Sequence, residues 1–236
     1  IPARYGSTRL PGKPLCEING IPLVMWVYNC AVRSEVFDSV VVATDDQRIF
    51  DVVENRGGTA IMTSPNHPRG TDRVHEVVQK MPCTHVVNLQ GDEPCMPARV
   101  LQKLVNELKK IDNNTLLTIA SDATIEEIDR PHCVKVVLNR AGEALYFSRS
   151  PIPYNLSSNG HYLKHKGIYG FTSGGLEKFC SFPEGELEKT ESLEQLRALE
   201  YGMKIKCIRS NFDTVGIDTP EDLEKFRKQV ETGYEF

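Results

Sequence analysis

The sequence of 236 residues has little that would tie it to a membrane, an oxidising compartment or a nucleic acid. No apolar run approaches the roughly 18 residues of a membrane-spanning helix, and no secretory signal pattern is seen. The 28 basic residues are outnumbered by 32 acidic ones, so the net charge of −4 predicts no nucleic-acid partner. The seven cysteines are odd in number, widely spaced and without a C-x-x-C pair. This pattern predicts free thiols in a cytoplasmic protein, and neither a disulfide framework nor a zinc finger.

Two common glycine-rich nucleotide signatures are also missing. A Walker A loop needs four residues between its glycines and a Ser or Thr after its Lys. Here five residues separate Gly6 from Gly12, and Pro14 follows Lys13. No two of the 17 glycines lie two positions apart, which argues against a Rossmann G-x-G-x-x-G loop and a dinucleotide-dependent dehydrogenase.

Short β-branched runs alternate with amphipathic helical patterns along most of the chain. Strands are expected over 40–43, 85–89, 116–120 and 204–208. Helices are expected over about 46–55, from Thr71, from Pro97, and over about 173–181, 189–201 and 219–231. This alternation predicts an α/β fold in which helices flank a mostly parallel sheet. We expect one domain over residues 1–236.

The stretch at about 131–171 departs from that alternation. Strand patterns over 134–139, 144–148 and 166–171 have no long helix between them, and Arg140–Glu143 forms a hairpin-like turn. This stretch is predicted to be a β-rich subdomain within the domain.

The first 14 residues form a basic loop with almost no apolar pattern. They include three cations, two glycines and the small hydroxyl residues Ser7 and Thr8. Glycines let backbone amides approach a ligand closely, while Arg4 and Lys13 can bind phosphate oxygens. The loop therefore predicts polyphosphate binding, and a solvated basic loop is the alternative.

Two carboxylates are candidate ligands for a hard cation. Asp92 follows the strand at 85–89, where open α/β sheets place their ligands. Asp218 precedes Thr219, which with Pro220 makes a good helix start that does not need Asp218. We expect the two aspartates to hold Mg²⁺ between them. Alone, Asp92 is equally compatible with a turn-forming aspartate after glycine.

A second basic segment runs through Gly70, Thr71 and Arg73. Arg73 falls in the first turn of a predicted helix, where its charge opposes the helix dipole. That cost indicates a function for Arg73, and an ion pair with Asp72 or Glu76 is the alternative. Further polar candidates have no informative context on sequence alone: Arg149, His165, Tyr169, Glu194 and Gln195. Among these, His165 is expected at the surface and Glu194 on a solvated helix face.

Taken together, seven ordered blocks resemble the 3-deoxy-manno-octulosonate cytidylyltransferase family. The most specific are Ile1–Pro14 and the run Asn88-Leu89-Gln90-Gly91-Asp92-Glu93-Pro94, and the last is Gly216–Leu223. The others are Val134–Val137, Leu145–Arg149, Gly167–Gly170 and Leu193–Arg197. The resemblance extends from Ile1 to about Lys228. Arg69 stands where this family usually has Ser, and Pro131-His132-Cys133 replaces a more typical Pro-Asn-Ala.

The resemblance implies an enzyme that joins CTP to the eight-carbon sugar acid Kdo, giving CMP-Kdo and pyrophosphate for lipopolysaccharide synthesis. It implies Mg²⁺ dependence, a cytoplasmic location and a homodimer, with the 131–171 stretch as the dimerisation arm. Lys13, Asp92 and Asp218 would be catalytic, and both aspartates would bind the metal. The implied CTP-binding residues are Arg4, Ser7, Thr8, Lys13, Gly70, Thr71 and Arg73. The implied Kdo-binding residues are Gln90, Arg149, His165, Tyr169, Glu194 and Gln195.

Two other functions remain compatible with these patterns. A CMP-sialate synthetase would share the basic loop and the metal carboxylate. A nucleotide-binding protein without activity is the second alternative, although the joint presence of Arg4, Lys13, Asp92 and Asp218 argues against it.

Overall fold

The computed structural model describes residues 1–6, 10–94, 96–156, 160–212, 216–217 and 219–232. The chain divides into two compact units. The first contains residues 1–82, 88–105 and 213–236, and the second contains 83–87 and 106–212. The boundary falls within α4 (Ala98–Leu108), whose last residues belong to the second unit.

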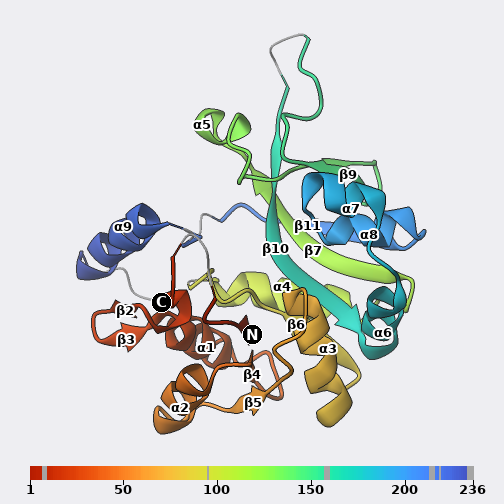
Figure 1. The fold of residues 1–236 in the computed structure, drawn as a ribbon. Helices are drawn as coiled ribbons and strands as arrows, with labels where there is room; N and C mark the ends of the chain where they lie inside the picture. The colour runs from red at the N-terminus through yellow and green to blue at the C-terminus, as the bar shows by residue number, and fades with distance from the viewer. Residues whose placement is uncertain (7–9, 95, 157–159, 213–215, 218, 233–236) are drawn as a thin grey trace. The chain divides into compact units, whose positions relative to one another are not determined.

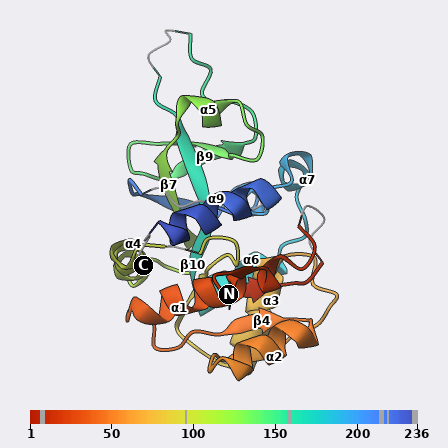
Figure 2. The same cartoon turned by 90° about the vertical axis from the view of Figure 1, so that its left-hand side faces the viewer.

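A three-stranded parallel sheet forms the centre of the first unit (Figures 1 and 2). Its order is β1 (Pro2–Ala3), β4 (Val42–Thr44) and β5 (Ala60–Met62). The helices α1 (Leu23–Arg33), α2 (Gln47–Asn55) and α3 (Gly70–Lys80) belong to the same unit. The helix α2 begins where expected because the Asp46 carboxylate caps it, accepting a 3.0 Å hydrogen bond from the Arg48 amide.

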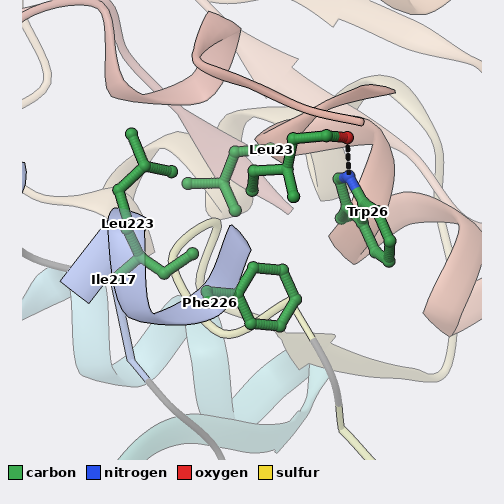
Figure 3. Close-up of a cluster of buried hydrophobic side chains, with 6 residues drawn as sticks. Leu23, Trp26, Ile217, Leu223 and Phe226 are labelled. Carbon is green, nitrogen blue, oxygen red and sulfur yellow. Dashed lines mark hydrogen bonds between the residues drawn. The ribbon is translucent and has the colours of Figure 1, made fainter. Parts of the chain in front are cut away.

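A hydrophobic cluster joins the N-terminal and C-terminal parts of the first unit (Figure 3). The short 3₁₀ turn η1 (Lys13–Leu15) and the hairpin of β2 (Glu17–Ile18) and β3 (Ile21–Pro22) lead into α1. Trp26 of α1 packs edge-on against Phe226 of α9 (Pro220–Glu231), with ring centroids 5.6 Å apart. The Trp26 indole donates a 3.1 Å hydrogen bond to the Ile18 carbonyl, so its polar atom is satisfied inside the cluster.

The second unit is built on a mixed six-stranded sheet. Its main path runs β11 (Lys204–Arg209), β7 (Thr115–Asp122), β10 (Leu163–Thr172), β8 (Lys135–Leu138) and β9 (Ala144–Ser148). β6 (His85–Asn88) also pairs with β10. β11 and β7 are parallel, whereas the hydrogen-bonded pairs β7–β10, β10–β8 and β8–β9 are antiparallel. The remaining helices of this unit are α5 (Ile125–Ile128), α6 (Ser173–Ser181), α7 (Glu186–Glu191) and α8 (Gln195–Glu200).

The α/β class and the flanking helices are confirmed. The β-rich character of 131–171 is also present, but its strands β8, β9 and β10 belong to the larger sheet that contains β7 and β11. The prediction of a single helix over 189–201 is wrong. The chain forms α7 and α8 instead, because Ser192 adopts a left-handed conformation with φ of 52° and ends α7.

Candidate active site

In the first unit, the basic loop brings Lys13 onto Asp92. Gly12, with φ of 69°, turns the chain into η1, and a Cβ there would lie 3.1 Å from the Tyr5 ring. Lys13 Nζ then donates 2.9 Å hydrogen bonds to Asp92 Oδ2 and to the Ile217 carbonyl. The Ile217 amide returns a 2.9 Å hydrogen bond to the Asp92 carbonyl. The segments that contain Lys13 and Ile217, which are far apart in the sequence, are thus both bonded to Asp92.

The Lys13–Asp92 pair is accessible to solvent. The side chains are 15% and 34% exposed, so the ammonium and the carboxylate can exchange partners with a ligand. Arg4 is exposed at the start of the same loop. The expected ligands Ser7, Thr8 and Asp218 lie outside the described residues. Among the residues that are described, no group of three or more His, Cys, Asp or Glu side chains is arranged to hold a metal.

Asp92 has the right chemistry for a magnesium ligand. Its carboxylate is a hard oxygen donor on a loop that follows a strand, and one oxygen already accepts from a cation. Of the two expected metal ligands, Asp92 is the one among the described residues, and its chemistry fits that role.

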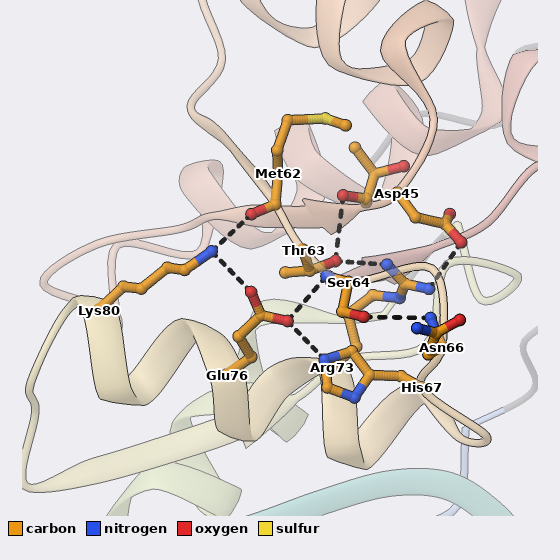
Figure 4. Close-up of polar contacts among 10 residues, drawn as sticks. Asp45, Met62, Thr63, Ser64, Asn66, His67, Arg73, Glu76 and Lys80 are labelled. Carbon is orange, nitrogen blue, oxygen red and sulfur yellow. Dashed lines mark hydrogen bonds and ion pairs between the residues drawn. The ribbon is translucent and has the colours of Figure 1, made fainter.

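Arg73 lies deep within the first unit (Figure 4). Its guanidinium is 3.0 Å from Asp45 Oδ2 and donates to the Thr63 hydroxyl, and the residue is only 3% exposed. The expected alternative of a pair with Asp72 or Glu76 is therefore wrong. Asp45 and Thr63 follow β4 and β5, so Arg73 joins the carboxyl ends of two neighbouring parallel strands.

Thr71, expected near the nucleotide, and Gln90, expected near the sugar acid, both form hydrogen bonds with Asn88. Asn88 Nδ2 donates a 3.0 Å hydrogen bond to the Thr71 hydroxyl, and Gln90 Nε2 donates a 3.4 Å bond to Asn88 Oδ1. Gly70 begins α3 beside Pro2, where a Cβ would come within 3.2 Å of the proline ring. Asn88 itself is fully buried; it begins the Asn88–Pro94 run but was not among the expected site residues.

Glu76 fastens the segment that precedes α3 (Figure 4). Its Oε2 accepts a 2.8 Å hydrogen bond from the Ser64 amide and lies 2.5 Å from His67 Nε2. Its Oε1 is 2.6 Å from Lys80 Nζ, one helical turn along α3. The Lys80 hydrogen bond is the main reason that the pKa of Glu76 falls to about 2, with the Ser64 amide and His67 adding to it. The 64–67 segment is therefore held by an ionised carboxylate.

In the second unit, Arg149 binds backbone carbonyls. Its guanidinium donates to the carbonyls of Glu191, Pro131 and Ser192 at 2.7, 3.0 and 3.1 Å. Two of these acceptors lie at the C-terminal end of α7, where a cation complements the helix dipole. The Glu191 carboxylate accepts in turn from the Arg149 amide and the Ser148 hydroxyl, at 2.9 and 2.6 Å. Arg149 thus holds the turn between α7 and α8.

His165, Tyr169 and Gln195 lie together in the second unit. The imidazole ring centroid is 4.9 Å from that of Phe147 and 5.6 Å from that of Tyr169. The Tyr169 hydroxyl donates a 3.0 Å hydrogen bond to Gln195 Oε1, and Gln195 Nε2 is a buried donor with no hydrogen-bond partner among the described residues. The side-chain amide of Gln195 therefore lies beside a cluster of aromatic side chains.

His165 is half-buried, and it is not the exposed surface residue that was expected. Burial, with a smaller contribution from the charge of Lys166, lowers the pKa of His165 to about 3, so the ring is neutral at physiological pH. Burial likewise raises the pKa of Tyr169 well above its ordinary value, with a further contribution from the negative charge of Glu194. Glu194 is half-buried at the start of α8 and has a buried Oε2, so it does not lie on a solvated face either.

Thr118, which contacts His165, was not among the residues expected in the site. Thr118 Oγ1 lies 2.8 Å from His165 Nε2 within the β7–β10 pair. A threonine in an apolar strand gives no local signal of this contact, since it arises from strand pairing. The candidate residues therefore form two groups. Arg4, Lys13, Gly70, Thr71, Arg73, Gln90 and Asp92 belong to the first unit, and Arg149, His165, Tyr169, Glu194 and Gln195 belong to the second.

No described helix has the length and apolar character needed to cross a membrane. A family model described as cytidylyltransferase matches residues 1–205. A 3-deoxy-manno-octulosonate cytidylyltransferase from Thermodesulfovibrio yellowstonii is 47% identical over 250 residues, covering 98% of this chain and 97% of the relative. An 8-amino-3,8-dideoxy-manno-octulosonate cytidylyltransferase from Shewanella frigidimarina is 42% identical over 231 residues, covering 95% and 94%.

The fold comparison agrees with the sequence comparison. A solved structure of CMP:2-keto-3-deoxy-manno-octonic acid synthetase complexed with CTP superposes with a TM-score of 0.92 and 42% identity. The match covers 98% of this chain and 96% of that one. The expected resemblance is confirmed, and the chain belongs to the cytidylyltransferase family.

Proposed function

We propose that the chain transfers CMP from CTP to the anomeric hydroxyl of 3-deoxy-D-manno-octulosonate (Kdo), releasing pyrophosphate. The observation that carries this proposal is the match to a synthetase of the same sugar nucleotide, solved with CTP, over 98% of the chain. Relatives named 3-deoxy-manno-octulosonate cytidylyltransferase, at 47% and 42% identity over nearly the whole chain, support it.

In this reaction the anomeric oxygen of Kdo forms a new bond to the α-phosphorus of CTP. The bond from that phosphorus to the bridging oxygen of the leaving pyrophosphate breaks in line, and the hydroxyl proton is lost to solvent. Such transfers depend chiefly on positioning and on charge neutralisation. Lys13 and Arg4 would bind the triphosphate, together with Ser7 and Thr8. Gly70, Thr71 and Arg73 would build the wall on the cytosine side, and Arg73 would act there by holding the two strand ends.

Asp92 and Asp218 would hold Mg²⁺. When bound, the ion neutralises phosphate charge and makes the sugar hydroxyl easier to deprotonate. Lys13 Nζ already rests on Asp92 Oδ2, so the same ammonium is positioned to move to the phosphate oxygens while the carboxylate accepts the metal.

The sugar acid would be bound by Gln90, Arg149, His165, Tyr169, Glu194 and Gln195. Gln195 Nε2, which has no hydrogen-bond partner in the part of the chain that the structure describes, would donate to a substrate oxygen. His165 stays neutral, so it would contribute a hydrogen bond and not a charge. Arg149 uses three of its five N–H donors on carbonyls, which leaves two for the carboxylate of Kdo.

The remaining parts of the proposal follow from the family. CMP-Kdo would serve lipopolysaccharide synthesis in the cytoplasm, and the enzyme would act as a homodimer. The 8-amino sugar of the Shewanella relative is the alternative substrate, because that relative is as similar to this chain as several Kdo enzymes are.

A pyrophosphate-release assay tests the proposal. The enzyme is given CTP and Mg²⁺ with Kdo, with the 8-amino sugar, or with sialic acid, each over a range of concentrations. Turnover with Kdo at a kcat/KM at least about tenfold above the other two, a difference of roughly 1.4 kcal/mol in transition-state stabilisation, supports the proposed substrate. If the enzyme preferred the 8-amino sugar or sialic acid, that sugar acid would replace Kdo as the proposed substrate. If no sugar acid led to release of pyrophosphate, the transferase function would be contradicted.

A further inference from the structure

An irregularity in the β7–β10 pair lies beside the expected sugar-acid residues. Lys166 pairs with Ile119 and Tyr169 with Thr118, so Gly167 and Ile168 are extra residues on β10. Such a bulge interrupts the regular ladder between the two strands. Here the side chain of Thr118 reaches two carbonyls of the bulged segment. Its hydroxyl lies 2.8 Å from the Ile168 carbonyl and 3.1 Å from the Lys166 carbonyl.

The hydroxyl of Thr118 has one proton and three close neighbours. Two of those neighbours are carbonyl oxygens, which can only accept, and Thr118 is fully buried, so no water supplies a substitute donor. The proton must therefore point toward the carbonyls. If it pointed instead at His165 Nε2, the hydroxyl oxygen would face both carbonyl oxygens without a proton between them. Two acceptor oxygens at these distances repel each other when no proton lies between them.

The third neighbour of the hydroxyl is His165 Nε2, at 2.8 Å. Because the Thr118 oxygen is already donating to the carbonyls, it can only accept from the ring. Nε2 must then carry the proton, and in a neutral imidazole Nδ1 is left as an acceptor. The Phe147 and Tyr169 rings and the Thr118 hydroxyl contact the imidazole, and the charge of Lys166 acts on it electrostatically. Among the described residues none hydrogen-bonds Nδ1.

We propose that Thr118 is a positioning residue that fixes His165 as the Nε2–H tautomer and thereby makes Nδ1 a hydrogen-bond acceptor for a hydroxyl group of the sugar acid. This inference rests on the proposed function for the identity of the ligand, whereas the tautomer itself does not depend on it. An acceptor at this point selects a substrate atom that can donate. It disfavours a carboxylate or a carbonyl oxygen there, since two acceptors would face each other.

Nuclear magnetic resonance tests the tautomer without any substrate. The six histidines are labelled with ¹⁵N, and the ring signals of His165 are identified by their loss in His165→Gln. The parent enzyme should show a protonated Nε2 and an unprotonated Nδ1 at neutral pH. In Thr118→Val, which removes the hydroxyl but keeps the shape, the ring should change to the other tautomer or to a mixture. Thr118→Ser keeps the hydroxyl and should restore the parent spectrum.

Steady-state kinetics test the consequence for the substrate. Thr118→Val should lower kcat/KM for the octulosonate about 3- to 10-fold and leave the KM for CTP unchanged, which is the effect of one neutral hydrogen bond. Thr118→Ser should stay within about twofold of the parent. Thr115→Val is the matched control, because Thr115 begins the same strand and its hydroxyl binds Asp112. Sugar acids that lack one hydroxyl each identify the donor, since the Thr118→Val loss should vanish for the analogue without it.

The outcomes separate the two proposals. A parent ring with its proton on Nδ1, or a tautomer that Thr118→Val does not change, overturns the role of Thr118. The expected tautomer together with an unchanged kcat/KM in Thr118→Val overturns the selection of a hydroxyl. If the parent enzyme shows no turnover with any sugar acid, the proposed function fails, and with it the substrate part of this inference. The parent spectrum is decisive for the tautomer even if Thr118→Val does not fold.

Discussion

At the scale of single residues, the carboxylate of Asp92 has the largest expected effect on catalysis. Asp92→Asn keeps the shape but removes the charge that Lys13 contacts and that a divalent cation would need. We expect kcat to fall by about 100-fold or more, as when other transition-state electrostatic contacts are lost. The fold should persist, because a partly exposed ion pair contributes about 1 kcal/mol or less. Kinetics at varied Mg²⁺ and a thermal melt measure both.

The matched control for Asp92 is Asp51→Asn. Asp51 lies on α2, and its carboxylate binds the exposed Gln47 side chain. That variant should behave like the parent in both measurements. If Asp92→Asn retained turnover within a few-fold of the parent, Asp92 would not be a metal ligand.

Arg149→Lys distinguishes substrate binding from support of the α7–α8 turn. Lysine has no planar fork, so it cannot keep three carbonyl contacts and also grip a carboxylate. The Tm should fall to some extent in either case, because the turn loses carbonyl contacts. If Arg149 also binds the sugar acid, kcat/KM for Kdo should fall about 10- to 100-fold while the KM for CTP stays close to that of the parent. A lower Tm with both substrates affected equally would mean that Arg149 acts only by holding the turn.

The residue scale also shows what the sequence could and could not reveal about the site. Lys13 and Asp92 were identified from their own loops, and the structure places them in contact across 79 positions. The local sequence did not predict the contacts of a residue whose partner lies far away in the sequence. Arg73 bonds Asp45 and not a neighbour in its helix, and His165 is enclosed by residues from other strands. Thr118 acquires its role only through a bulge on the strand beside it.

At the scale of elements, the capping box of α9 offers a clear test. The Thr219 hydroxyl accepts from the Asp222 amide at 3.2 Å, and the Asp222 carboxylate accepts from the Thr219 amide at 3.1 Å. Thr219→Ala should lower the free energy of unfolding by about 1 kcal/mol, because the start of α9 loses its cap. Urea unfolding followed by circular dichroism measures it.

Thr232→Ala is the control for that cap. Thr232 is exposed at the other end of α9, and its hydroxyl bonds only carbonyls of the last turn. Its loss should change stability by less than about 0.5 kcal/mol. Equal losses in the two variants would show that the cap does not stabilise the helix.

Most elements followed from local pattern, and the exceptions have physical causes. The helix α6 over Ser173–Ser181 and the strand β9 over Ala144–Ser148 match the expected ranges. The helix α1 was not predicted, because its first five residues, Leu23 to Val27, are all buried and apolar. Without alternating polar positions, this run has no helical periodicity to recognise. The turn at Ser192 could not be predicted either, because serine has no strong preference for the left-handed conformation that separates α7 from α8.

At the scale of the whole molecule, both units contain a carboxylate, among the described residues, whose pKa is lowered to about 2. In the first unit, Glu76 is shifted mainly by its hydrogen bond from Lys80. In the second unit, Glu107 is shifted mainly by Lys110 and then by Lys206, which lies 99 positions away. A carboxylate with a lowered folded-state pKa stabilises the fold above its unfolded pKa, and that contribution is lost as the pH falls from about 4.5 toward 2.

Glu76→Gln should therefore be less stable than the parent at pH 7, by about 1 kcal/mol, since its partly exposed ion pairs are screened by solvent. Below pH 4.5 the parent protonates Glu76 on unfolding, so the difference between the two proteins should narrow and close near pH 2. Urea midpoints at pH 7, 4 and 2.5 measure this, with the exposed Glu224→Gln as the control. A difference that stayed constant across the three pH values would show that Glu76 acts through the shape of its side chain and its hydrogen bonds. A difference that closes would show that the charge of Glu76, held between the 64–67 segment and α3, stabilises the first unit.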